Sequence, residues 1–165
     1  MPRRRRMNAA ARTLGAALAC LSAPGAYAAV TCTASAVGVA FGVYNPLAAA
    51  PTTSTGSIAV TCTSTSNGTT TINLSASYST GSSGTYATRT MRSGGNVLNY
   101  NLYFDAAYTQ VRGDGTNGTQ NGSATLSLGR NQSATATGVL YGRAPAGQDV
   151  APGVYSDTIT VTVTY

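Results

Sequence analysis

The chain has 165 residues, a formal net charge of +6, a pI near 9.6 and three cysteines. Taken whole, this composition describes a basic single-domain protein with one cysteine left over. The sequence contains no His, Lys, Glu or Trp. This excludes a histidine base, a histidine metal ligand and a Schiff-base lysine, and it argues against an enzyme.

The first 28 residues have the pattern of a secretory signal peptide. Four consecutive arginines at 3–6 make a basic start, a short apolar run spans residues 14–21, and Ala26-Tyr27-Ala28 has the A-x-A cleavage pattern. The apolar run is too short to span a membrane as a helix. We expect residues 1–28 to direct export to the periplasm and then the cell surface, and residues 29–165 to form one mature domain.

Removal of this leader changes both the net charge and the number of cysteines. Five arginines and four aspartates remain, so the expected net charge falls to +1, and nucleic-acid binding loses its electrostatic basis. Cys20 leaves with the leader, so that Cys32 and Cys62 remain as a pair. An alternative is a lipoprotein acylated at Cys20, which Ala17 disfavours because such sites usually have a larger aliphatic residue at that position.

Apolar residues of the mature chain recur with period two, as in strands that have one buried face. The β-branched content agrees, and turn residues such as Asn45-Pro46 and Gly94-Gly95 separate the segments. Seven short strands of this kind predict an all-β sandwich. In chain order, the alternating residues are Val37, Val39, Phe41 and Val43; Ile58, Val60 and Cys62; Ile72, Leu74, Ala76 and Tyr78; Leu98, Tyr100, Leu102 and Phe104; Leu126 and Leu128; Val139 and Tyr141; and Ile159, Val161, Val163 and Tyr165.

The two mature cysteines, Cys32 and Cys62, fall on the first and second predicted strands. Because an exported chain meets an oxidising compartment, we expect them to form a disulfide rather than remain as two buried thiols. Two cysteines without any histidine are too few ligands for zinc.

Other candidate sites have simpler structural interpretations. The segment 112–118 carries oxygen ligands and glycines that could hold calcium, but Asp-Gly and Asn-Gly are ordinary turn dipeptides. Asp149 and Asp157 could form a carboxylate pair, although solvated loop acids are the default interpretation. The tyrosines could form a sugar-binding surface, but we expect core packing for those in phase with apolar strand positions. These tyrosines are Tyr78, Tyr100 and Tyr141. We predict that the protein binds no metal and no cofactor.

The alternation is clearest over residues 154–165, where the given sequence ends. A strand of this quality at a bare edge is a liability that proteins usually blunt with Lys, Pro or a bulge, and none of these interrupts the segment. The strand is therefore expected either to lie centrally or to border a gap that another chain fills. The residues of the strand expected to border that gap are Tyr155, Ile159, Val161, Val163 and Tyr165.

An ordered set of short motifs resembles the spore coat protein U domain family, whose members include pilin-like subunits of archaic chaperone–usher pili. The chain departs from the family at Arg112, where Trp is frequent before Gly-Asp-Gly, so the family pattern does not predict how this loop packs. The matching pieces are Cys32-Thr33-Ala34-Ser35, Val39-Ala40-Phe41-Gly42-Val43-Tyr44-Asn45-Pro46, Gly56-Ser57-Ile58-Ala59-Val60-Thr61-Cys62, Asn99-Tyr100-Asn101-Leu102-Tyr103, Gly113-Asp114-Gly115-Thr116, Tyr141-Gly142-Arg143 with Gln148, and Gly153-Val154-Tyr155-Ser156-Asp157-Thr158 with Val161-Thr162-Val163-Thr164-Tyr165.

The resemblance implies an immunoglobulin-like sandwich that lacks its last strand. It further implies that a periplasmic chaperone, working with an usher, lends a strand, which the N-terminal extension of a neighbouring pilus or coat subunit later replaces. Only residues 29–31 lie between the predicted cleavage site and Cys32, whereas a donor strand needs about ten residues. We therefore expect a terminal or tip-type subunit. The alternatives are a spore or cell-surface coat protein and a carbohydrate-binding adhesive module.

Overall fold

The computed structural model describes residues 29–165, and the predicted signal peptide with Cys20 lies outside the described residues. The described chain contains eight strands and one 3₁₀ turn, η1 (Gly81–Ser83). In chain order the strands are β1 (Val30–Val37), β2 (Thr52–Ser64), β3 (Thr70–Tyr78), β4 (Arg89–Ser93), β5 (Asn96–Tyr103), β6 (Gly122–Leu128), β7 (Gln132–Ala144) and β8 (Val161–Thr164).

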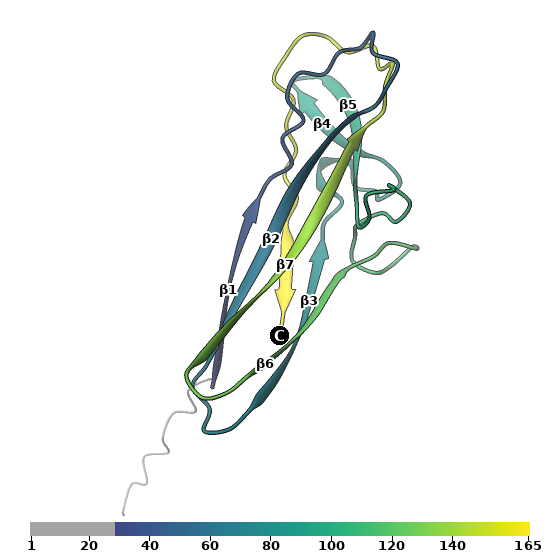
Figure 1. The fold of residues 1–165 in the computed structure, drawn as a ribbon. Coiled ribbons are helices and arrows are strands. Elements are labelled where there is room, and N and C mark those ends of the chain that lie inside the picture. The colour runs from purple at the N-terminus through teal and green to yellow at the C-terminus, as the bar shows by residue number, and fades with distance from the viewer. Residues whose placement is uncertain (1–28) are drawn as a thin grey trace, which may run out of the picture.

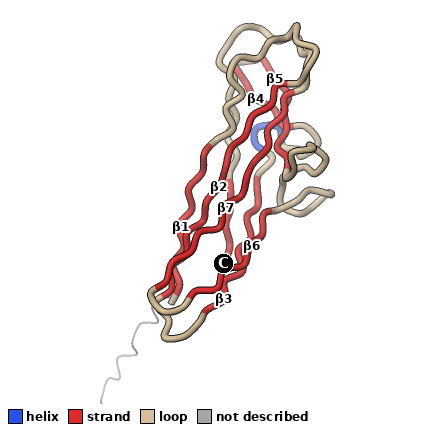
Figure 2. Tube along the Cα trace, in the orientation of Figure 1, coloured by secondary structure: helices blue, strands red, loops and turns tan. Residues whose placement is uncertain are grey.

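The strands form two antiparallel sheets. One has the order β1-β2-β7-β5-β4, and the other has the order β6-β3-β8. The sheets lie against each other along the length of an elongated molecule (Figures 1 and 2). The all-β sandwich predicted from the alternation is confirmed. Among the residues that the structure describes, none forms a helix of the length and hydropathy needed to cross a membrane.

The core lies between the sheets and follows the period-two pattern. On β2 and β3 the inward side chains are buried, whereas their neighbours in sequence face outward. A second buried cluster lies where β4 and β5 meet the upper end of β7. The buried residues of the two clusters are Ile58, Val60, Cys62, Ile72, Leu74, Tyr78, Leu128 and Leu140 in the first, and Met91, Leu98, Tyr100, Leu102 and Ala144 in the second.

The prediction of a strand over residues 37–43 is wrong. The first strand, β1, lies earlier in the chain and ends at Val37, and the residues after it form no regular strand. Val39 and Phe41 instead cross over Gly142 of β7, where an added Cβ would lie 2.8 Å from the Phe41 ring. Gly142 therefore provides the space that the crossing segment needs, because any larger residue would displace it.

β4 was not predicted, because one of its two buried positions is occupied by an arginine. Arg89 is fully buried, and its guanidinium donates to the Asn101 side-chain oxygen at 2.7 Å and to the backbone oxygens of Ser79 and Arg112 at 2.8 Å. Burial lowers the pKa of Arg89. A buried cation with this many acceptors ties β4 to β5 and to the loop after β3.

On β7 the strand prediction is confirmed, but the predicted inward face is wrong. Leu140 is buried, whereas Val139 is 42% exposed and Tyr141 is half-buried on the opposite face. Core packing is confirmed for Tyr78 and Tyr100 and not for Tyr141. The inward face of β7 consists mainly of alanine and glycine, which carry little apolar signal in the sequence.

The predicted disulfide is confirmed. Cys32 of β1 and Cys62 of β2 are directly opposed in the strand register, and their sulfurs are bonded. The bridge joins residues 30 apart, and closing such a loop stabilises the folded chain by about 3–4 kcal/mol on the chain-entropy model. Since β1 pairs with no other described strand, the bridge also fastens an edge strand to the sheet.

The double variant Cys32→Ala/Cys62→Ala should lose about 3–4 kcal/mol of unfolding free energy, because its unfolded state is no longer constrained. Urea unfolding measures the loss. As a control, a reducing agent should lower the urea midpoint of the parent protein and leave that of the double variant unchanged. An equal midpoint for parent and double variant would contradict the stabilising role.

Candidate functional site

One side of the sandwich carries a free edge from each sheet. β1 ends the five-stranded sheet and β8 ends the three-stranded sheet, and each pairs with a single described strand, β2 and β3 respectively. Both strands run along the long axis of the molecule in Figure 1. Within residues 29–165, the outer backbone N–H and C=O groups of these two strands therefore have no strand partner.

A cavity of about 310 Å³ lies between these two edges. Residues 36–39, at the end of β1 and just beyond it, line one side. Tyr155, Ile159 and Val161, on the segment that enters β8, line the other side. Buried core side chains such as Leu140 complete the lining. We call this cavity the β1/β8 groove.

The five residues predicted to border a gap are distributed over this side of the protein. Tyr155, Ile159 and Val161 line the β1/β8 groove, while Val163 lines a different cavity. Tyr155, Ile159, Val161 and Val163 are half-buried against the core, whereas Tyr165 is 60% exposed and lines neither cavity. The structure thus brings three of the five together.

The alternation predicted one continuous strand over residues 154–165, but the C-terminal segment is interrupted in the structure. Ser156 pairs with Arg92 of β4 through two backbone hydrogen bonds of 2.9 and 3.1 Å, whereas β8 begins only at Val161 and pairs with β3. The segment therefore passes from the edge of one sheet to the edge of the other, and the ladder is interrupted where it crosses. The side chains still alternate between half-buried and exposed through the crossing.

Asp157 holds the crossing in place. Its carboxylate accepts hydrogen bonds from the Tyr100 hydroxyl at 2.8 Å and from the backbone N–H groups of Ser82 and Thr158 at 2.9 Å each. Burial, followed by this bond to Asp157, raises the pKa of Tyr100. Tyr100 therefore stays protonated, and its hydroxyl donates a hydrogen bond to the carboxylate, which joins β5 to the C-terminal segment.

The structure does not bring Asp149 and Asp157 together as a carboxylate pair, and the acid of segment 112–118 binds within its own turn. Asp149 is exposed, whereas Asp157 is engaged as described above. Asp114 accepts from the backbone N–H and the hydroxyl of Thr116 within its own turn, at 2.9 and 2.7 Å. These bonds lower the pKa of Asp114. Over residues 29–165, no three His, Cys, Asp or Glu side chains gather as a metal site would require.

The comparisons with known proteins agree with this architecture. The family model of the Spore Coat Protein U domain matches residues 17–162, and the chain belongs to that family. No curated protein matches the sequence.

Among solved structures, the fold is similar to a chain of the CsuC–CsuE chaperone–tip adhesion subunit pre-assembly complex from the archaic chaperone-usher Csu pili of Acinetobacter baumannii. The TM-score is 0.53 and the sequence identity is 20%; the match covers 82% of this chain and 40% of that chain. This chain therefore spans less than half of the matched chain's length.

The variant Asp157→Ala should cost about 1–3 kcal/mol of unfolding free energy, because it leaves the hydroxyl of the buried Tyr100 and two backbone N–H groups without their acceptor. Urea unfolding measures the cost. The matched control is Asp149→Ala, which removes an exposed acid from the preceding loop and should change stability by less than about 0.5 kcal/mol. Equal effects of the two variants would show that Asp157 does not hold the crossing.

Proposed function

We propose that this protein is an exported, non-enzymatic surface subunit whose sandwich is completed by an extended strand of another chain, inserted in the β1/β8 groove. The observation that carries the proposal is the pair of unpaired strand edges that flank one apolar cavity. Backbone N–H and C=O groups strongly favour hydrogen-bonded partners, and a strand placed between the two edges would satisfy both.

The lining of the groove suits such a strand. Side chains of an extended segment alternate between its two faces, so every second residue would point into the groove against Ile159, Val161 and Leu140. The residues between them would face solvent. An inserted strand should therefore have alternating apolar and polar residues.

Family membership and fold likeness support the partners that we propose. The similar solved chain comes from a chaperone–subunit complex of a chaperone-usher pilus. By analogy, we propose a periplasmic chaperone as the first strand donor, an usher as the assembly platform and a neighbouring pilus or coat subunit as the final donor. The absence of His, Lys and Glu from the sequence supports a structural rather than a catalytic role.

We also propose a terminal or tip-type position in the assembly. Val30 is already paired with Ser64 of β2, so residues from Val30 onward are part of the subunit's own sheet. If cleavage follows residue 28, only Ala29 precedes that strand. Such a subunit could accept a strand but could not donate one.

A synthetic peptide of about nine residues with alternating apolar side chains should stabilise the purified protein. At a free concentration about a hundredfold above its Kd, it should raise the unfolding free energy by about 2.7 kcal/mol and Tm by roughly 10 °C. Thermal unfolding measures the shift. A peptide of the same composition with its apolar residues grouped at one end should give no shift.

The variant Ile159→Asn should weaken peptide binding by about tenfold or more, because it places an amide where an apolar side chain faces the groove. Thr160→Asn is the matched control, since Thr160 is the neighbouring exposed position. Strand completion would be contradicted by a highly stable isolated protein whose Tm shifts equally with the alternating peptide and with the peptide whose apolar residues are grouped.

The intact mass of the exported protein tests the terminal position. We expect the mature chain to start at or near Ala29, because the leader ends on the A-x-A pattern. Mass spectrometry of the secreted protein measures the start directly. A mature N-terminus ten or more residues upstream would provide a donor extension and would contradict the terminal role.

A further inference from the structure

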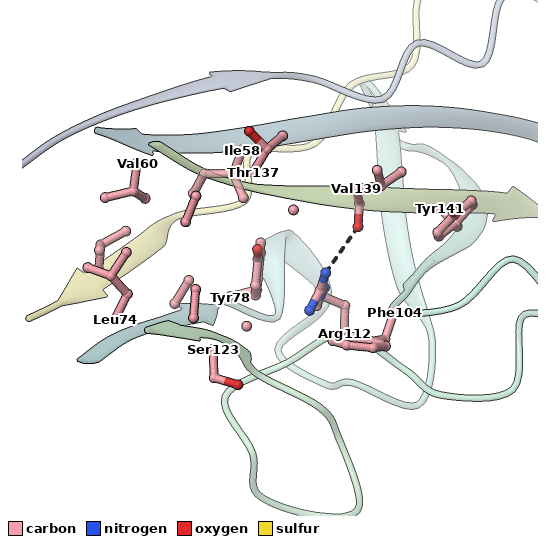
Figure 3. A pocket seen from close by; sticks show the side chains of 16 residues that line it. Ile58, Val60, Leu74, Tyr78, Phe104, Arg112, Ser123, Thr137, Val139 and Tyr141 are labelled. Atoms are coloured by element: carbon pink, nitrogen blue, oxygen red, sulfur yellow. Dashed lines mark hydrogen bonds between the residues drawn. The ribbon is translucent and has the colours of Figure 1, made fainter. Parts of the chain in front are cut away.

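A second cavity, of about 300 Å³, lies between β6 and β7, in a different part of the sandwich from the β1/β8 groove. Figure 3 shows it from close by, with side chains of both sheets around it. Its lining includes core residues such as Ile58, Val60 and Leu74, so the cavity reaches the apolar interior. This volume is at the small end of the range for ligand pockets in proteins.

The cavity exists because β6 and β7 belong to different sheets. β6 pairs with β3, and β7 pairs with β2 over its whole length but with β5 only at residues 141–143. Between the turn at residues 129–131, which joins β6 to β7, and residue 141, this edge of β7 pairs with no described strand. Small residues face the space between the two strands and leave it open, namely Gly122, Ala124, Ala136 and Gly138.

The side chain of Arg112 lies at one end of this cavity, as Figure 3 shows. Arg112 is 3% exposed, and its guanidinium lies 4.3 Å from the centre of the Phe104 ring and 5.2 Å from that of Tyr78. Its Nη2 donates to the Val139 backbone oxygen at 3.0 Å, and Nη1 donates to that of Asn121 at 3.5 Å. Two aromatic rings and two carbonyls thus fix its position.

The charge of Arg112 has no anionic counterpart in the described chain. Both acceptors are neutral carbonyls, and the Nε atom is buried with no hydrogen-bond partner among residues 29–165. Burial lowers the pKa of Arg112. A desolvated cation is costly unless an anion or further acceptors compensate it.

We propose that the β6/β7 cavity binds an aliphatic monocarboxylate, with its hydrocarbon chain against Ile58, Leu74 and Ala136 and its carboxylate against the Arg112 guanidinium. The apolar lining matches the hydrocarbon chain, and the uncompensated cation at the end matches the single negative charge. The site lies between β6 and β7 rather than at the outer edges of β1 and β8, and Val163 is the residue of β8 that lines it. Tyr78 is the one described residue that lines both cavities.

Calorimetric titration of the purified exported protein with decanoate tests the proposal. The matched ligand is decanol, which has the same chain length and no charge, and both are used below the concentration at which they aggregate. Decanoate should bind with one-to-one stoichiometry and at least about tenfold more tightly than decanol, because a hydrogen bond to a charged group contributes more than one to a neutral group.

Variants locate the binding in the cavity. Ala136→Leu fills the cavity without replacing Arg112 and should abolish decanoate binding. Thr135→Leu is the control, since it places the same new side chain on the outer face of the same strand, and it should bind as the parent does. Arg112→Met should remove the preference for decanoate over decanol. If Arg112→Met does not fold, Ala136→Leu and the decanol comparison still decide the outcome.

Four results would overturn the proposal. The first three are no decanoate binding, equal affinity for decanoate and decanol, and decanoate binding that Ala136→Leu leaves unchanged. The fourth is binding of an acidic apolar peptide in place of decanoate, because the occupant would then be a polypeptide strand. None of these results bears on the β1/β8 groove, whose test uses different residues and a different ligand.

Discussion

The structure depends on an open seam in its backbone hydrogen bonding, at the β1/β8 groove. β1 and β8 end their respective sheets on the two sides of the β1/β8 groove, and neither has a partner on its outer edge among the described residues. The two sheets cover most of the core, but the outer backbone groups of β1 and β8 lack a strand partner in the described chain. On the function that we propose, a strand of another chain closes this seam.

The rest of the fold keeps both edges of the seam in position. The disulfide fastens β1 to β2, and Asp157 fastens the crossing segment to Tyr100 and the backbone of Ser82. Arg89 ties β4 and β5 together through Asn101. Because these contacts are internal, the two edges can present a preformed groove, which lowers the ordering cost of binding a strand.

The sequence predicted those features that depend on local alternation, including β2, β3 and the disulfide partners. It failed where an inward position is not apolar: β4 was missed because Arg89 is buried, and the face of β7 was misassigned because its inward residues are small. The crossing at Asp157 and the β6/β7 cavity depend on which strands become neighbours. Such long-range pairing leaves no periodic signal, and Arg112 gave no sign of its burial except its departure from the family pattern.

The most direct measurement of the central claim is hydrogen–deuterium exchange of the exported protein, alone and bound to its strand donor. The account predicts fast exchange for the outward-facing amides of β1 and of residues 158–164 in the isolated protein. Those amides should become protected on binding, while the amides between β2 and β7 stay protected throughout. Full protection of both edges in the isolated protein, or no change on binding, would contradict it.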